Sequence, residues 1–222
     1  METNLKKITE AINNLKTGDV VSFRGERLFS KVVKFLQKTL QDPDDDTYQI
    51  SHVSLVVKED WTDNMPISIE SLWDPFKGYD GVVAIPMTKR LQMYNGSLTF
   101  HILQKDGKNV ELTKEQKDQL KKSFETYKGR KFERRLFSML KSAIDNSPLF
   151  SENKKDISMM FCSEFTTQIF LDVGLLNESK PSSEYTPVEF IKAKLSNGYS
   201  LKEGISVMGG TNIKIKKNSK KK

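Results

Sequence analysis

Three side chains of this sequence have the types needed for nucleophilic chemistry: the only cysteine, Cys162, and the only histidines, His52 and His101. A thiol attacks a carbonyl carbon as the thiolate, and a neighbouring imidazole can take up its proton. One cysteine and two widely separated histidines lack zinc-ligand spacing, so no metal or cofactor is predicted. The alternative is that Cys162 is a small buried hydrophobe, which is the commonest environment of free cysteine.

The segment MMFCSEFTTQIF around Cys162 is predicted to be helical. Start signals at Asp156 and Ser158 place Cys162 near the first turn, and the helix is expected to run to about Leu171 and end at Gly174. A helix N-terminus lowers the pKa of a thiol through the helix dipole. The backbone N–H of Cys162 would also be available to stabilise an oxyanion.

Of the two histidines, His52 is the stronger candidate for the general base. It opens the predicted strand HVSLVV, where a side chain can project at the end of a sheet. His101 lies in the middle of the predicted strand SLTFHILQ, opposite the apolar side chains of that strand. A histidine on that polar side is predicted to be a surface residue.

A base of this kind needs an acceptor that orients its ring, and Glu70 is the candidate. Glu70 lies in the alternating segment ISIESL, the next predicted strand after that of His52. If the two strands are neighbours, Glu70 can lie beside His52 on one face of the sheet. An acid within such a strand is costly unless it is paired. The alternative is a carboxylate on the surface of an edge strand.

The elements that must position these residues follow from the hydrophobic periodicity. An amphipathic surface helix is predicted within residues 1–19. Strands are predicted at 17–25, 52–57, 67–72, 81–87 and 97–104, and helices at 28–40, at 113–127 with Thr113 as N-cap, at 136–144, and from Thr186 with Pro187 in the first position. The acidic segment 41–46 is predicted to be a surface loop. Strands in the middle with helices at both ends predict an α+β fold with an antiparallel sheet.

The composition predicts a single domain at residues 1–212 and a basic, disordered tail at 213–222. The chain has 222 residues, 36% of them hydrophobic and 29% charged, with a net charge of +7. Lysines without acids dominate the tail, which either solubilises the protein or makes a weak contact with a polyanion. No apolar run is long enough to span a bilayer, and the N-terminus lacks the apolar core of a signal peptide. A reducing location, the cytoplasm or a virion, is therefore expected.

Several motifs resemble those of a known superfamily. GDVVSF and SHVSLVV look like two strands of the NlpC-like cysteine peptidases, in which the cysteine helix comes first. Here FCSEF follows the strands, an order that resembles the circularly permuted branch of the papain-like fold. That branch includes the YiiX/YebB-like proteins, a poxvirus group and the lecithin:retinol acyltransferase relatives.

Four further segments resemble the YiiX-like pattern: ISIES, GYDGVVAIPM, FCSEFTTQIF and EYTPVEF. The motifs together span about residues 17–190. The resemblance implies a permuted papain-like fold, with a central antiparallel sheet or small barrel packed against helices and the nucleophile at a helix N-terminus. It also implies a catalytic Cys162, with His52 as base and Glu70 as the group that orients it. The acidic segment 41–46 and the stretch 105–158 are departures that leave the substrate open.

The leading hypothesis is a thiol hydrolase that cleaves amide or ester acyl bonds of a peptide-like or acylated substrate through an acyl-enzyme. Acyl transfer shares its first half-reaction. A second hypothesis is a non-catalytic or virion-associated binding protein with a basic tail. A third is a lipid-related acyltransferase at a membrane surface.

Overall fold

The computed structural model describes residues 2–25, 49–132, 159–177, 180–210 and 214–215. The helices predicted at 28–40 and 136–144 and the loop at 41–46 lie outside the described residues. Within them, no helix has the combined length and apolar character needed to cross a membrane.

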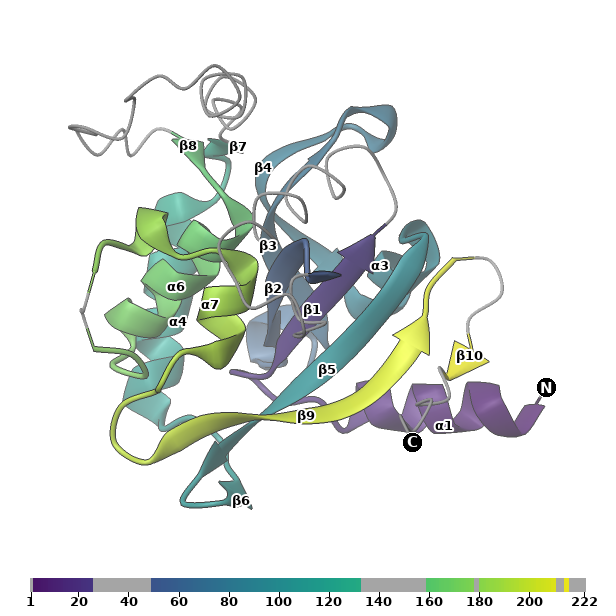
Figure 1. Ribbon diagram of the computed structural model, residues 1–222, viewed down its shortest axis with the longest axis horizontal. Coiled ribbons are helices and arrows are strands. Elements are labelled where there is room, and N and C mark those ends of the chain that lie inside the picture. The colour runs from purple at the N-terminus through teal and green to yellow at the C-terminus, as the bar shows by residue number, and fades with distance from the viewer. Residues whose placement is uncertain (1, 26–48, 133–158, 178–179, 211–213, 216–222) are drawn as a thin grey trace.

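The described elements are helices and strands interspersed along the chain (Figure 1). The α-helices are α1 (Glu2–Asn13), α3 (Met87–Met93), α4 (Lys114–Tyr127), α6 (Cys162–Asp172) and α7 (Pro187–Lys192). Short 3-10 helices are η2 (Asp60–Thr62), η3 (Pro75–Lys77) and η4 (Ser182–Glu184). The strands are β1 (Val20–Gly25), β2 (His52–Val57), β3 (Ile67–Asp74), β4 (Tyr79–Pro86), β5 (Gly96–Lys105), β6 (Lys108–Asn109), β7 (Lys131–Phe132), β8 (Met159–Met160), β9 (Tyr199–Met208) and β10 (Lys214–Ile215).

The main sheet is antiparallel, in the order β10-β9-β5-β1-β2-β3-β4, with β6 paired to β5. The five predicted strands and the α+β class with an antiparallel sheet are confirmed. The long strand β9 was not predicted. Lys214 and Ile215, two residues of the predicted basic tail, pair with Met208 and Val207 of β9 as β10. The prediction for residues 216–222 lies outside the described residues.

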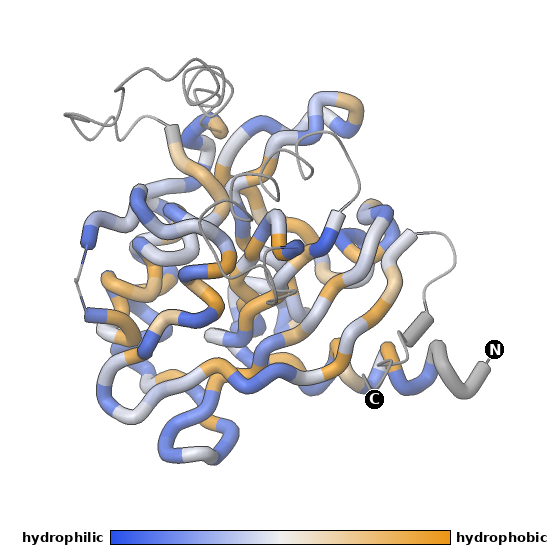
Figure 2. Tube along the Cα trace, viewed as in Figure 1, coloured by the Kyte–Doolittle hydropathy of each residue, from blue (hydrophilic) through white to orange (hydrophobic). Residues whose placement is uncertain are grey.

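Helices cover both faces of this sheet. Alternate side chains of each strand point to opposite sides, and each side carries apolar residues that pack against helices. In β1, Val20 joins the core formed with α4, α6 and α7, whereas Val21 and Phe23 join the core formed with α1 and α3. Figure 1 shows the two groups of helices on opposite sides of the strands. In Figure 2 orange segments alternate with white and blue ones along the central strands, and the projecting turn between β5 and β6 is largely blue.

Local signals explain two of the three helix starts that the sequence predicts. Thr113 accepts a hydrogen bond from the backbone N–H of Gln116 at the start of α4, and Thr186 caps α7 ahead of Pro187 in the same way. The third start is wrong: α6 begins at Cys162 itself rather than near residues 156–158. The reason is tertiary, because β8 pairs with β7 and so holds the residues before the helix in an extended form.

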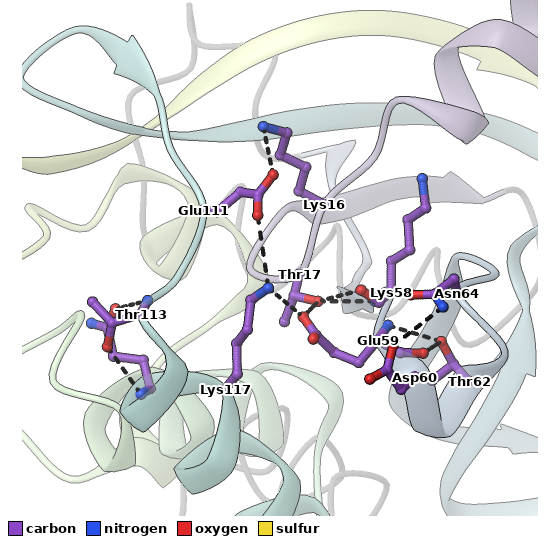
Figure 3. Close-up of polar contacts among 11 residues, drawn as sticks. Lys16, Thr17, Lys58, Glu59, Asp60, Thr62, Asn64, Glu111, Thr113 and Lys117 are labelled. Atoms are coloured by element: carbon purple, nitrogen blue, oxygen red, sulfur yellow. Dashed lines mark hydrogen bonds and ion pairs between the residues drawn. The ribbon is translucent and has the colours of Figure 1, made fainter.

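A polar network fixes the Val57 end of β2 against α4 (Figure 3). Thr17, which is buried, donates a hydrogen bond of 2.5 Å to the carboxylate of Glu59, and the same carboxylate pairs with Lys117 of α4 at 3.0 Å. Lys117 and Lys16 both reach Glu111. The network lies at the opposite end of β2 from His52 and links the start of β1, the end of β2 and α4.

A close backbone approach at Gly81 leads toward the cysteine helix. Gly81 has φ +126°, and a Cβ there would lie 1.9 Å from the carbonyl oxygen of Arg130. The next residue, Val82, takes a backbone hydrogen bond from Gly129 and donates one to Arg130. This contact places β7, whose partner β8 leads directly into Cys162.

We therefore expect Gly81→Ala to lower the free energy of unfolding by at least about 2 kcal/mol, because it combines a strained φ with a backbone clash. Gly78→Ala is the matched control. Gly78 also has a positive φ, +75°, but open space surrounds the position of its Cβ, so only the conformational strain remains. Chemical denaturation of both variants measures the difference. Equal losses would contradict the close approach.

Candidate active site

Cys162 is the first residue of α6 and is 5% exposed. The helix is capped by Glu164, whose carboxylate accepts the backbone N–H of Phe161 at 3.2 Å. The N–H groups of a first helical turn have no acceptor within the helix, and the N–H of Cys162 is one of these groups. The sulfur therefore lies at the positive end of the α6 dipole.

Two backbone N–H groups, those of Val53 and Ser163, form hydrogen bonds with the sulfur of Cys162. The strand geometry explains the contribution of Val53. Val56 donates its N–H to Asp19 on the β1 side, and successive residues of a strand point their N–H groups to alternate sides. The N–H of Val53 thus points to the β3 side. β2 pairs with β3 from Leu55 to Val57, and the start of α6 meets β2 at Val53, just beyond this pairing.

His52 and Glu70 lie beside each other on the face of the sheet that carries α3. The Nε2 atom of His52 is 2.5 Å from Oε2 of Glu70, and the ring is also hydrogen-bonded to Cys162. With Nε2 engaged by Glu70, Nδ1 is the nitrogen available to the thiol. The structure thus brings together Cys162, His52 and Glu70. The alternative of a surface carboxylate is wrong, because Glu70 has no exposed area.

Arg90 of α3 completes the group and has no counterpart in the sequence-based prediction. Its Nε and Nη2 atoms donate to the two oxygens of Glu70 at 2.6 and 2.9 Å. Ser68 donates a further hydrogen bond of 2.8 Å to Oε1. The guanidinium lies 4.4 Å from the ring centre of Phe23, and that ring contacts His52 edge-on at 5.0 Å. Arg90 is 4% exposed, so its charge is buried against that of Glu70.

The charges of this group support one another against the cost of burial. Burial raises the pKa of Glu70, but the charge of Arg90 and the bond from His52 outweigh it and hold that pKa well below its usual range. Burial lowers the pKa of His52, yet the Cys162 thiolate and Glu70 together raise it to about 9. Burial likewise raises the pKa of Cys162, and the imidazolium with the two backbone N–H groups brings it below its ordinary value. The arrangement favours a thiolate–imidazolium pair.

His101 lies in a different place from the one the sequence predicts. It is not a surface residue, because it is 4% exposed and its Nε2 atom forms a hydrogen bond of 2.8 Å with Ser22 of β1. Burial, aided by the charge of Arg24, lowers its pKa to about 4, so the ring is neutral near pH 7. The error came from equating the polar side of a strand with solvent.

Within the described part of the chain, no group of three or more histidine, cysteine, aspartate or glutamate side chains could hold a metal ion.

No protein-family model matches the chain, and no curated protein matches it. Among solved structures, it is similar to the crystal structure of the metalloprotein YiiX from Escherichia coli O157:H7, with 17% sequence identity and a TM-score of 0.46. The match covers 71% of this chain and 66% of that one, just under two thirds of its length. Such a likeness carries no argument about the site. The permuted papain-like topology stays a prediction.

Removing Arg90 tests the electrostatic arrangement. We expect Arg90→Met to lower the free energy of unfolding by about 3–5 kcal/mol, because it leaves the Glu70 carboxylate buried without its cation. Adding Glu70→Gln should restore part of this loss, since the stranded charge is then gone. The control is Lys89→Met on the exposed side of the same helix, with an expected change within about 0.5 kcal/mol. Additive losses in the double variant would argue against the pairing.

Proposed function

We propose that this chain is a thiol-dependent hydrolase of amide or ester acyl bonds, with Cys162 as nucleophile, His52 as general acid and base, and Glu70 as the group that positions the ring. The observation that carries the proposal is the continuous hydrogen-bonded row from the sulfur of Cys162 through His52 to Glu70. A nucleophile, a base and an orienting acceptor in hydrogen-bond contact form the arrangement that covalent catalysis requires.

The proposed reaction begins with attack of the Cys162 thiolate on the carbonyl carbon. The N–H of Cys162, free at the start of α6, donates to the oxyanion that forms. His52, already protonated in the ion pair, gives its proton to the leaving amine or alcohol, and a thioester remains on the sulfur. His52 then takes a proton from water, whose oxygen attacks the thioester. Release of the acid regenerates the thiolate–imidazolium pair.

A catalytic role explains a cluster that stability alone does not require. Replacing a buried ionic group by well-packed apolar residues is often neutral or stabilising, so buried charges are weak evidence for a structural purpose. Here the charges end at a sulfur held as a nucleophile. The acyl-transfer, lipid-related and binding-protein hypotheses remain predictions, and acyl transfer differs from the proposal only in the acceptor that replaces water.

An electrophilic thiol probe tests the proposal directly, because the chain has a single cysteine and labelling reports one site. We expect Cys162→Ala to abolish labelling. His52→Ala should slow labelling by about 100-fold or more, the usual contribution of a general acid or base. Intact-protein mass spectrometry follows the added mass over time. Undiminished labelling of the folded His52→Ala protein would reject the site.

The pH dependence of iodoacetamide labelling tests the role of Glu70. Glu70 raises the pKa of His52, so Glu70→Gln should lower the pKa of the imidazole and weaken the positive charge beside the thiol. The pKa of Cys162 should then rise, and the midpoint of the rate profile should move to higher pH. Glu111→Gln, at an exposed carboxylate, is the control and should leave the midpoint in place. An unshifted midpoint in folded Glu70→Gln would show that the carboxylate does not act on the pair.

A further inference from the structure

Two faces of the same strands differ sharply in polarity near the proposed site. On the face covered by α1 and α3, β1, β5 and β9 present apolar side chains: Val21, Phe23, Leu98, Phe100 and Val207. On the face that carries α6, the alternating positions are mostly polar. We call six of these positions the polar strip: Ser22, Arg24, Ser97, Thr99, His101 and Ser206. Packing alone favours apolar side chains in these strands, as the face covered by α1 and α3 shows. The polar side chains on the other face therefore need another explanation.

Most of the polar strip is covered, and part of it is internally satisfied. Ser22 and His101 form a hydrogen bond of 2.8 Å, and Thr99 and Ser206 form one of 2.7 Å. Ser22, Thr99 and His101 are each no more than 5% exposed. Covered polar groups lower stability unless their hydrogen bonds are made, so packing alone would favour apolar side chains at these positions.

Arg24 is the member of the polar strip that is not satisfied. Its Nε atom is buried and forms no hydrogen bond, while the side chain as a whole stays partly exposed. No carboxylate among the described residues forms an ion pair with Arg24. Arg90 provides the contrast, since its guanidinium donates twice to Glu70. A guanidinium in this state has unused donors of the geometry that suits a carboxylate or a phosphate.

The fold places Arg24 in the strand that neighbours the strand of His52. Phe23, the residue before it, pairs with His52 across the β1–β2 ladder, and the residue after it donates its N–H toward Ser51. Val53, two residues beyond Ser51, donates its N–H to the sulfur of Cys162. Arg24 shares the sheet face on which α6 packs, because it alternates with Phe23 on the α3 face. Arg24 thus lies on the strand next to that of His52, on the sheet face that carries α6, whose first residue is Cys162.

We propose that the polar strip binds a negatively charged group of the substrate, a carboxylate or a phosphate, with Arg24 as the ionic contact, so that the acyl carbonyl lies at Cys162. The inference rests on the proposed function and narrows its substrate class to acyl compounds that carry an anion. His101 is neutral near pH 7 and supplies hydrogen bonding without charge, so the recognition charge of the strip is that of Arg24.

Alkylation of Cys162 by iodoacetate and iodoacetamide tests the inference without a known substrate. The two reagents are similar in size, and in both the thiolate forms the S–C bond and iodide leaves, but only iodoacetate is an anion. We expect Arg24→Gln to slow iodoacetate by about fivefold, the effect of one unit charge several ångströms away at intermediate dielectric. The iodoacetamide rate should stay unchanged, which also reports an intact fold. Arg24→Lys should keep most of the iodoacetate preference.

The control for lost charge is Lys16→Gln, at the opposite end of β2, which should leave the rate ratio at the wild-type value. An unchanged ratio in Arg24→Gln, with Cys162 still reactive, overturns this inference and leaves the proposed function standing. If neither reagent labels Cys162 faster than a free thiol, the proposed function fails, and the inference fails with it.

A substrate panel separates the two sources of negative charge. The panel holds esters with one acyl chain that ends in a carboxylate, a phosphate or a neutral amide. We expect kcat/KM for the preferred anionic ester to fall by about 10- to 100-fold in Arg24→Gln, the worth of a charged hydrogen bond. The neutral ester should be unaffected. Equal losses for all three esters would mark Arg24 as structural, and faster turnover of the neutral ester by the wild type would also refute the proposal.

Discussion

The carboxylate of Glu70 has no contact with water, and this one buried charge constrains the rest of the site. An ionised carboxylate costs several kcal/mol to bury unless both oxygens are paired and hydrogen-bonded. Arg90, Ser68 and His52 together supply four donor contacts to its two oxygens. To make these contacts, α3 must pack against β3, and β2 must be the neighbour of β3. The position of Glu70 therefore fixes three elements around the imidazole.

In the ion-paired state that these pKa shifts favour, the charges alternate in sign along the row: Arg90 is positive, Glu70 negative, His52 positive and Cys162 negative. Each group shifts the pKa of the next toward its charged form, and the formal charges sum to zero. Such a set can be buried at lower cost than any single member. The pKa of the Cys162 thiol consequently depends on Arg90 in α3. Arg90 acts through Glu70 and His52, which lie between it and the thiol in the row of hydrogen bonds.

The parts of the fold and of the site that could be predicted from the sequence are those whose sequence signal is local. The strand of His52 is a β-branched run and that of Glu70 alternates clearly. Because neighbouring antiparallel strands can place the two side chains together, both candidates followed from the sequence. Arg90 did not, because MTKRLQM is a short segment with two cations and nothing in it shows which cation turns inward. The true start of α6 was missed because the pairing of β8 with β7 is a long-range contact. Strand β9 carries two charged residues and a glycine, which weaken its strand pattern.

His101 shows why the polar face of a strand is ambiguous evidence. Alternation gives the face on which a side chain lies, but it does not say whether water or protein covers that face. In β1 and β5 the covered polar face contains Arg24, which forms no ion pair with a carboxylate among the described residues, whereas the charges of the cluster around Glu70 are balanced. In a balanced cluster each charge is paired with one of opposite sign, so the cluster attracts a charged ligand only weakly. The guanidinium of Arg24, in the strand next to that of the imidazole, has an unpaired Nε atom that is available to an anion. Under the proposed function, one group of charges therefore activates the thiol, and the other orients the substrate that the thiol attacks.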